Sequence, residues 1–152
     1  MKKKIVLFSV IFCLLLVLTG CGNKKAITPQ EFTSIAQANN YNVSDATNQF
    51  SDYSQVREVK IARNNDYQIE FYVLNSESDA KSMYEYNKSL FEAYKISNYS
   101  ESHVDLNNYS TYSLQSSGYY MFLSRIDNTL VYVKEPVEYK SNIDEFIKKL
   151  GY

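Results

Sequence analysis

Residue types that build common catalytic and metal sites are scarce in this chain of 152 residues. Tryptophan is absent, histidine occurs once, at His103, and the only cysteines are Cys13 and Cys21. A structural zinc site needs four nitrogen or sulfur ligands, more than these residues supply. Glycine occurs four times and never in the spacing of a phosphate-binding loop. We therefore expect no metal ion and no cofactor.

The sequence also has no large excess of positive or negative charge. Lysine and arginine number 16 against 17 acidic residues, for a formal net charge of −1. The only basic run is Lys2–Lys4, and the acidic residues are scattered along the chain. Without a basic stripe, nucleic acid is excluded as a partner. The overall charge bears on solubility and not on a binding partner.

A long hydrophobic run is also missing. Lys2–Lys4 precede an apolar stretch, Ile5–Leu18, that is interrupted only by Ser9. A membrane-spanning helix needs roughly 20 apolar residues. A basic start, a shorter apolar run and then small residues are typical of a secretory signal peptide. The alternative is a buried apolar helix with an incidental cysteine.

The end of this run resembles the lipobox of bacterial lipoproteins, which is leucine, two small residues and cysteine: Leu18, Thr19, Gly20 and Cys21. The resemblance implies cleavage after residue 20 and a diacylglyceryl group on the Cys21 thiol. Two acyl chains anchor a protein stably, whereas one does so only marginally. The implied organisation is a signal peptide (1–20), a lipidated cysteine with a short tether (21–27) and a single domain (28–152). Its partner is then the membrane, at the outer face of the cell.

The residues around the cysteine indicate which membrane this is. Gly22 is not the aspartate associated with inner-membrane retention in Gram-negative lipoproteins, and the Asn-, Lys- and Tyr-rich composition resembles that of low-G+C Gram-positive bacteria. Lys24 and Lys25 either add ~1 kcal/mol each near anionic lipid or belong to a plain linker. With Cys13 removed and Cys21 lipidated, the mature domain has no free thiol and no disulfide.

Helix and strand signals alternate along the domain. Thr28 and Glu31 form a capping box around Pro29, which predicts a helix that ends at 39–40. Apolar spacing predicts further helices over 80–94 and 143–150. Period-two alternation predicts strands at 58–61, 67–73, 103–106, 109–116, 119–126 and 130–134, separated by turn residues. Asn and Asp tolerate positive φ, so 63–66 is expected to close a hairpin.

These elements predict an α+β domain in which a largely antiparallel sheet packs with about three helices. The order also hints at an αβββ duplication, 28–74 followed by 78–134. The segment 45–55 shows no readable pattern. Its Asp45, Asn48 and Asp52 carry oxygen ligands, but their spacing matches no calcium loop, which favours a solvated loop.

Only one pair of residues has the arrangement of an acid–base site. His103 and Asp105 fall on the same face of a strand, as a general base and its orienting carboxylate would. No Gly-x-Ser-x-Gly elbow accompanies them. The alternative is an ordinary surface pair, and we therefore expect no catalytic residue.

Tyrosine is the abundant aromatic residue, with 15 copies. Period two assigns one sheet face to the helices: Ile69, Phe71, Val73, Leu114, Tyr120, Phe122, Ile126, Val131 and Val133. The opposite face receives Tyr72, Leu74, Tyr119, Met121, Leu123, Leu130 and Tyr132, with Arg125 and Lys134 at its rim. This second face is either covered by a helix or an aromatic binding platform. Its candidate binding residues are Tyr72, Tyr119, Met121, Leu123 and Tyr132.

The domain as a whole resembles small lipoproteins of low-G+C Gram-positive bacteria that have no assigned activity, through residues 28–32 (TPQEF) and 128–133 (NTLVYV). We expect a lipid-anchored binding module for an unknown protein, peptide or cell-wall component. An immunity lipoprotein that intercepts a membrane-active peptide is the alternative. A hydrolase using His103 is a third hypothesis.

Overall fold

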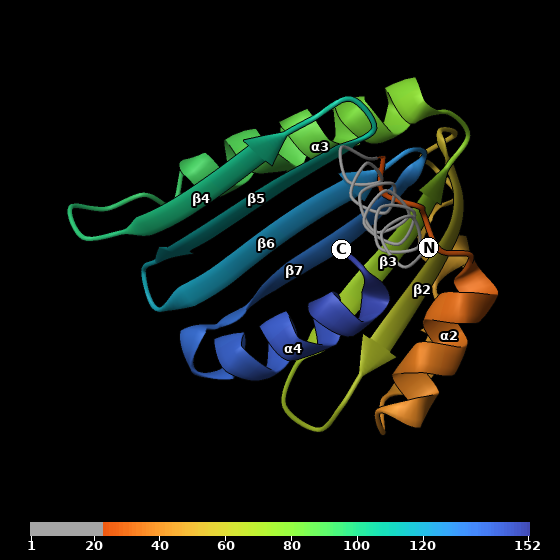
Figure 1. Ribbon diagram of the computed structural model, residues 1–152, viewed down its shortest axis with the longest axis horizontal. Coiled ribbons are helices and arrows are strands. Elements are labelled where there is room, and N and C mark those ends of the chain that lie inside the picture. Colours follow the sequence, from red (N-terminus) through yellow and green to blue (C-terminus); the bar gives the residue numbers. More distant parts are fainter. Residues whose placement is uncertain (1–22) are drawn as a thin grey trace, which may run out of the picture.

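The computed structural model describes residues 23–152, and the predicted lipobox, Leu18, Thr19, Gly20 and Cys21, lies outside them. Figure 1 shows one sheet with helices on it. The elements are α2 (Pro29–Ala38), β1 (Asn42–Asp45), the 3₁₀ helix η2 (Thr47–Phe50), β2 (Val56–Arg63), β3 (Gln68–Leu74), α3 (Glu77–Glu92), β4 (Ser100–Asp105), β5 (Tyr109–Ser116), β6 (Tyr119–Ile126), β7 (Thr129–Pro136), the 3₁₀ helix η3 (Val137–Tyr139) and α4 (Lys140–Leu150). Within this part of the chain, no helix is long and apolar enough to cross a membrane.

The seven strands form one sheet in the order β1-β2-β3-β7-β6-β5-β4. Every neighbouring pair is antiparallel. The predicted α+β class with three α-helices and an antiparallel sheet is therefore confirmed. The strand β1 was not predicted, because its four residues show no alternation of polar and apolar side chains.

Local chemistry explains the ends of several elements. The capping box is present: the Glu31 N–H donates to Thr28 Oγ1 (3.2 Å), and the Thr28 N–H donates to the Glu31 carboxylate (2.7 Å). The hairpin at 63–66 forms without positive φ, contrary to prediction. Its turn is held instead by Asn64 Oδ1, which accepts hydrogen bonds from the N–H groups of Asp66 and Tyr67, each at 2.9 Å.

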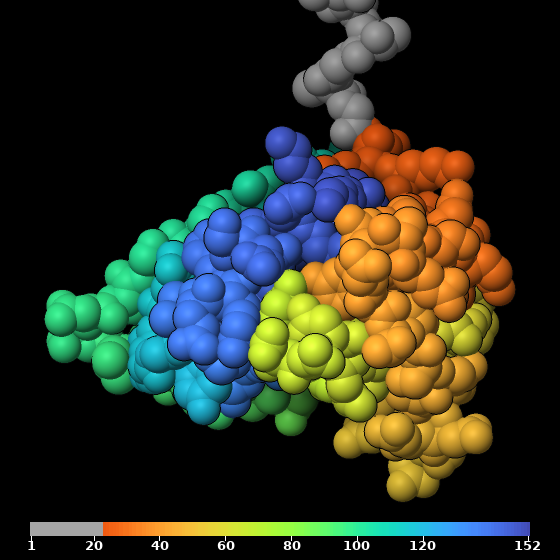
Figure 2. Space-filling model, turned by 90° about the horizontal axis from the view of Figure 1, so that it is seen from below, coloured from red at the N-terminus to blue at the C-terminus, as the bar shows by residue number. Residues whose placement is uncertain are grey.

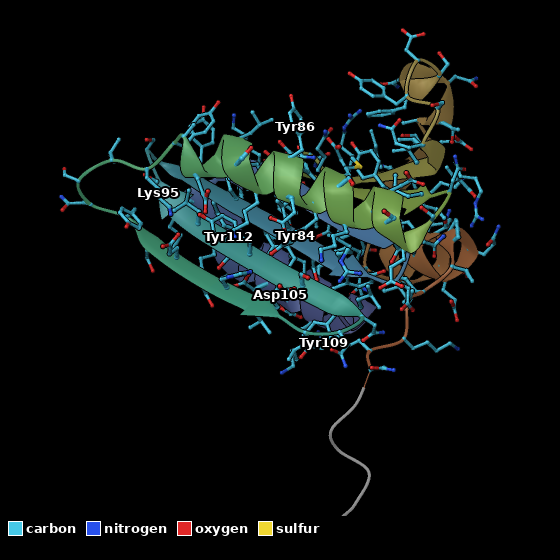
Figure 3. All side chains as sticks on the ribbon, turned by 90° about the horizontal axis from the view of Figure 1, so that it is seen from above. Tyr84, Tyr86, Lys95, Asp105, Tyr109 and Tyr112 are labelled. Carbon is cyan, nitrogen blue, oxygen red and sulfur yellow. The ribbon has the colours of Figure 1, made fainter. Side chains whose placement is uncertain are left out.

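The sheet lies between two helical layers. α2 and α4 cover one face, and Figure 2 shows them as the orange and blue surfaces. Phe32 of α2 stacks on Phe71 of β3 with ring centroids 4.9 Å apart, and it meets Phe146 of α4 edge-on. α3 covers part of the opposite face, where Tyr84 points from the helix toward the strands (Figure 3). Each face thus has its own hydrophobic core.

A twofold αβββ duplication is not the architecture of residues 23–152. β3 and β7 would be its equivalent strands, and they lie side by side and antiparallel. A rotation that exchanges such a pair keeps each helix on the same face of the sheet. α2 and α3, however, lie on opposite faces.

The register corrects two of the predicted positions. Leu114 pairs with Met121, so its side chain lies on the α3 face and not on the α2–α4 face. Arg125 is not at a rim, since only 3% of its surface is exposed. It bridges Glu77 and Ser110, with 3.3 Å to each, and the buried Arg125 therefore ties α3 to β5.

One end of the sheet carries the chain that leads in from the N-terminus. We call it the tether end, and it contains residues 24–28, the turns at 106–108 and 127–128, and the connection at 75–76. Hydrogen bonds link these segments in series: Asn108 to Lys24, Asp127 to Asn108, and Leu74 to Asn128. The opposite end of the sheet carries the turn at 117–118 and the 93–99 loop.

Candidate functional site

Helix α3 divides the predicted aromatic face into three parts. Met121 and Leu123 lie fully buried in the core beneath α3, together with Leu114 and Tyr84. They cannot contact a ligand, so their assignment to a binding platform was wrong. The reason is that α3 packs across β5, β6 and β7 and covers these two side chains. The apolar stripe of α3, formed by Ala80, Tyr84 and Phe91, is buried against these strands.

Tyr119 lies at the end of the sheet farthest from the tether and is 40% exposed. Its ring is 6.4 Å from that of Tyr94, in an edge-on arrangement. The Lys134 ammonium lies 3.9 Å from the Tyr94 centroid and 5.6 Å from the Tyr119 centroid. Lys134 therefore makes a cation–π contact with both rings. This small surface cluster is separate from Tyr72 and Tyr132.

Tyr72 and Tyr132 line a groove on the part of the face that α3 leaves uncovered. The groove lies between the first half of α3 and the segment 50–56, over β3 and β7, and its volume is about 740 Å³. Its lining residues are Phe50, Tyr53, Ser54, Gln55, Val56, Glu70, Tyr72, Asp79, Ser82, Met83, Tyr86, Asn87 and Tyr132. We call it the α3 groove.

Aromatic rings form the walls of the α3 groove. Phe50 meets Tyr72 edge-on at 5.3 Å and lies 6.1 Å from Tyr53, so the segment after β1 is held by ring contacts. Tyr132 packs against Phe91 of α3 at 5.2 Å. Tyr86 projects outward from α3 and stands free at the upper edge (Figure 3). Such walls offer apolar area with polar tips.

A carboxylate lies at the floor of the groove. Glu70 accepts a hydrogen bond from the Tyr72 hydroxyl and another, at 2.8 Å, from the Gln68 side-chain amide. Burial, followed by the negative charge of Glu70, raises the pKa of Tyr72 far above its ordinary range. The same two causes raise the pKa of Tyr132 to about 12. Both phenols therefore stay protonated and can donate hydrogen bonds.

The groove has negative charge without a matching cation. Glu70 and Asp79 are its charged residues, and no lysine, arginine or histidine is among the described residues that line it. The nearest cation in the hydrogen-bond network is Arg63, which donates to Gln68 Oε1 at 3.1 Å on the far side of that amide. A cationic group that entered the groove would thus meet a carboxylate already oriented by two donors.

The predicted acid–base pair lies elsewhere. His103 is on β4, an edge strand whose residues are all exposed, and it is not among the residues that line the groove. Asp105 accepts a hydrogen bond from Ser110 Oγ at 2.6 Å. His103 instead faces Tyr112, with ring centroids 6.3 Å apart. The structure therefore places His103 and Asp105 outside the α3 groove.

The oxygen-rich loop has a structural explanation. Asp45 accepts a hydrogen bond from the Thr47 N–H at 2.9 Å and pairs with Lys60 at 2.9 Å. Hydrogen bonding by the Thr47 side chain, followed by that of Lys60 and of the Thr47 N–H, holds the pKa of Asp45 well below its usual range. Across residues 23–152, no group of three or more His, Cys, Asp or Glu side chains is placed to hold a metal ion.

Of the residues that line the groove, sequence reasoning named only Tyr72 and Tyr132 as binding candidates. Phe50 and Tyr53 belong to the segment without a sequence pattern. Phe50 is placed by its contact with Tyr72 of β3, and Tyr53 by its contact with Phe50. Glu70 could have been found, because period two puts it on the same face as Tyr72, two residues away. An acid two residues before a tyrosine, on a strand face that also carries Leu74, is the signal that identifies it.

Comparisons with known proteins give one structural likeness. No protein-family model matches the chain, and no curated protein matches it. A solved structure from Thermotoga maritima, described as a GTP binding regulator, superposes with a TM-score of 0.48 at 18% sequence identity. The match covers 82% of this chain and 84% of the other. At this identity the likeness concerns the fold alone.

Proposed function

We propose that this protein is a lipid-anchored binding module at the outer face of the cell membrane. Its α3 groove takes a ligand that combines an apolar or aromatic part with a cationic group. The observation that supports this most directly is the Glu70 carboxylate, which lies at the floor of an aromatic groove with no cation beside it among the described lining residues.

The dimensions of the groove agree with this proposal. Sites of ~300–1,000 Å³ are typical for ligands the size of a small molecule, and the α3 groove has about 740 Å³. Phe50, Tyr72 and Tyr132 supply apolar contact area, while Asn87 and Gln55 supply amides at the walls. A few polar groups among aromatic side chains are what orients a bound ligand.

A peptide is the ligand class that the position of the groove favours. Its outer wall belongs to the tether end, because the Asn75 N–H donates to the Gln55 carbonyl and the Asn75 amide donates to Ser54. With a lipid on Cys21, this wall would lie beside the bilayer. An immunity-type protein that intercepts a cationic, membrane-active peptide is therefore the alternative that this arrangement supports.

Matched peptide probes test the charge requirement. We would titrate the protein with a short peptide of phenylalanine and lysine and with its counterpart in which norleucine replaces lysine. Heteronuclear NMR should show shifts at Glu70, Tyr72 and Tyr132 with the lysine peptide, and these shifts should weaken in high salt. Equal shifts with the norleucine peptide, or shifts that cluster at Tyr119, would overturn the proposal.

A further inference from the structure

The chain that follows Cys21 is fixed to the domain almost at once. The Lys24 N–H donates to Asn108 Oδ1 at 3.2 Å, and the Asn108 amide donates back to the Lys24 carbonyl at 2.6 Å. The same amide donates to Asp127 at 3.1 Å, which joins two turns of the sheet. A single side chain thus captures both backbone groups of Lys24 in the way that a neighbouring strand would.

The residues on either side of this contact are fixed as well. The Lys24 ammonium lies 4.9 Å from the centroid of the Tyr109 ring, a cation–π distance. Ala26 and Ile27 pack against the core beneath α2 and α4. Residues 24–27 therefore follow one path across the tether end and do not form a free linker.

This path limits the distance between the anchor and the sheet. Cys21 lies three residues before Lys24, and three extended residues span at most ~11 Å. The headgroup layer on one side of a bilayer is roughly 5–8 Å thick. A lipid on Cys21 would therefore bring the 106–108 turn to the surface of the bilayer.

The side chains at this end suit such a surface. β4 begins with Ser100, Glu101 and Ser102 but ends beside exposed apolar residues, Val104 and Leu106. Lys25 is exposed on the adjoining tether. Apolar side chains with lysines nearby are the combination found in segments that lie in the headgroup region of anionic membranes. The carboxylates at this end, Asp105 and Asp127, accept hydrogen bonds from Ser110 and Asn108.

We infer that the tether end is a membrane-contact surface, in which Leu106 and Val104 enter the headgroup boundary of an anionic bilayer beside Lys24 and Lys25. This inference rests on the proposed lipid anchor at Cys21. This contact fixes the orientation of the anchored domain relative to the bilayer, which a lipid on a flexible linker would leave free. The Tyr53 side of the α3 groove then lies near the lipid, and Tyr119 points away from it.

The absence of tryptophan allows a direct test, because one introduced tryptophan is the only indole in the chain. Leu106→Trp is compared with Ile96→Trp at the opposite end of β5, ~25 Å away. The two sites are matched in exposure, at 52% and 53%. Each lipidated variant is placed in phosphatidylglycerol vesicles that contain brominated lipids, which quench tryptophan in contact with them.

We expect position 106 to lose most of its emission and to shift to shorter wavelength, while position 96 changes little. Quenching that is equal at the two positions, or absent at 106 in vesicle-bound protein, overturns the inference. If the cell-derived protein carries no lipid, the anchor proposal fails on its own. The Cys21 thiol is then coupled to a maleimide lipid, and the two tryptophans are compared again.

A second pair of variants tests the captured tether. Asn108→Ala removes the three bonds of the amide, whereas Asn107→Ala at the neighbouring turn residue is the control. Introduced into both the Leu106→Trp and the Ile96→Trp variants, Asn108→Ala should reduce the difference in quenching between positions 106 and 96, and Asn107→Ala should not. The melting temperature shows whether the fold survives each change. An unchanged contrast in folded Asn108→Ala overturns the role of this contact in orientation.

Discussion

The Tyr72 hydroxyl donates a hydrogen bond to the Glu70 carboxylate two residues earlier on the same face of β3. Side chains at this spacing lie side by side on a strand, so the pair is built by local geometry alone. Gln68 extends the row and donates to the other carboxylate oxygen at 2.8 Å. One strand therefore supplies a carboxylate whose orientation is set before any ligand arrives.

Glu70→Gln should abolish the preference of the groove for a cationic ligand. A hydrogen bond to a charged group contributes about 1.5–3 kcal/mol, so binding of the lysine peptide should weaken by at least about tenfold. Calorimetric titration measures the loss. Glu85→Gln, on the exposed side of α3, is the matched control and should bind as the parent does. Equal weakening in both variants would show only a general charge effect.

Replacement of Tyr132 and Tyr119 by serine should have different effects on stability. Tyr132 is half-buried against Phe91, so Tyr132→Ser should lower the free energy of unfolding by about 2–3 kcal/mol. Tyr119 is 40% exposed, and Tyr119→Ser should change stability by no more than about 0.5 kcal/mol. Urea unfolding of both variants checks this. A large loss in Tyr119→Ser would mean that its contact with Tyr94 and Lys134 is structural.

The contrast between these residues shows how far strand periodicity carries a prediction. Alternation assigned Tyr72, Met121 and Tyr132 to one face correctly, because the side-chain period of a strand is two. Leu114 was placed on the wrong face because periodicity within β5 says nothing of its register against β6. Only the pairing of Leu114 with Met121 settles that relationship.

The sequence could not show which part of the face α3 covers. Helix–sheet packing depends on where the connections after β3 and before β4 place the helix, and neither has a local signal. As a result, Met121 and Leu123 became core while Tyr72 and Tyr132 remained at a groove. The segment around Phe50 was unreadable for a related reason, since its ring contacts come from distant strands.

Alkaline pH should unfold the domain by ionising its buried tyrosines. Burial raises the pKa of these phenols above the ordinary value of about 10: Tyr41, Tyr72, Tyr84, Tyr112, Tyr120, Tyr132 and Tyr152. A raised pKa in the folded state means that their contribution to stability is complete below about pH 10 and is lost above it. The part of the tyrosinate absorbance that comes from these buried tyrosines should rise in one late step, together with the loss of the circular dichroism signal. Complete ionisation of the tyrosines, the buried ones included, before any loss of circular dichroism would contradict this.

The last prediction concerns Cys21, the residue on which the proposed membrane attachment depends. Mass spectrometry of the mature N-terminus should show a diacylglyceryl cysteine at this position. Cys21→Ala removes the only thiol at the expected cleavage point, so the protein should lose its lipid and leave the membrane fraction. Cys13→Ala is the control, because Cys13 lies in the proposed signal peptide and should be absent from the mature protein. The melting temperature gives an independent check. The tether is held by the contact between Lys24 and Asn108, which does not involve Cys21, so the Cys21→Ala domain should keep its melting temperature while it dissociates from the membrane. An unmodified Cys21 in the wild-type protein, or a mature chain that begins elsewhere, would show that the lipobox resemblance does not describe this protein.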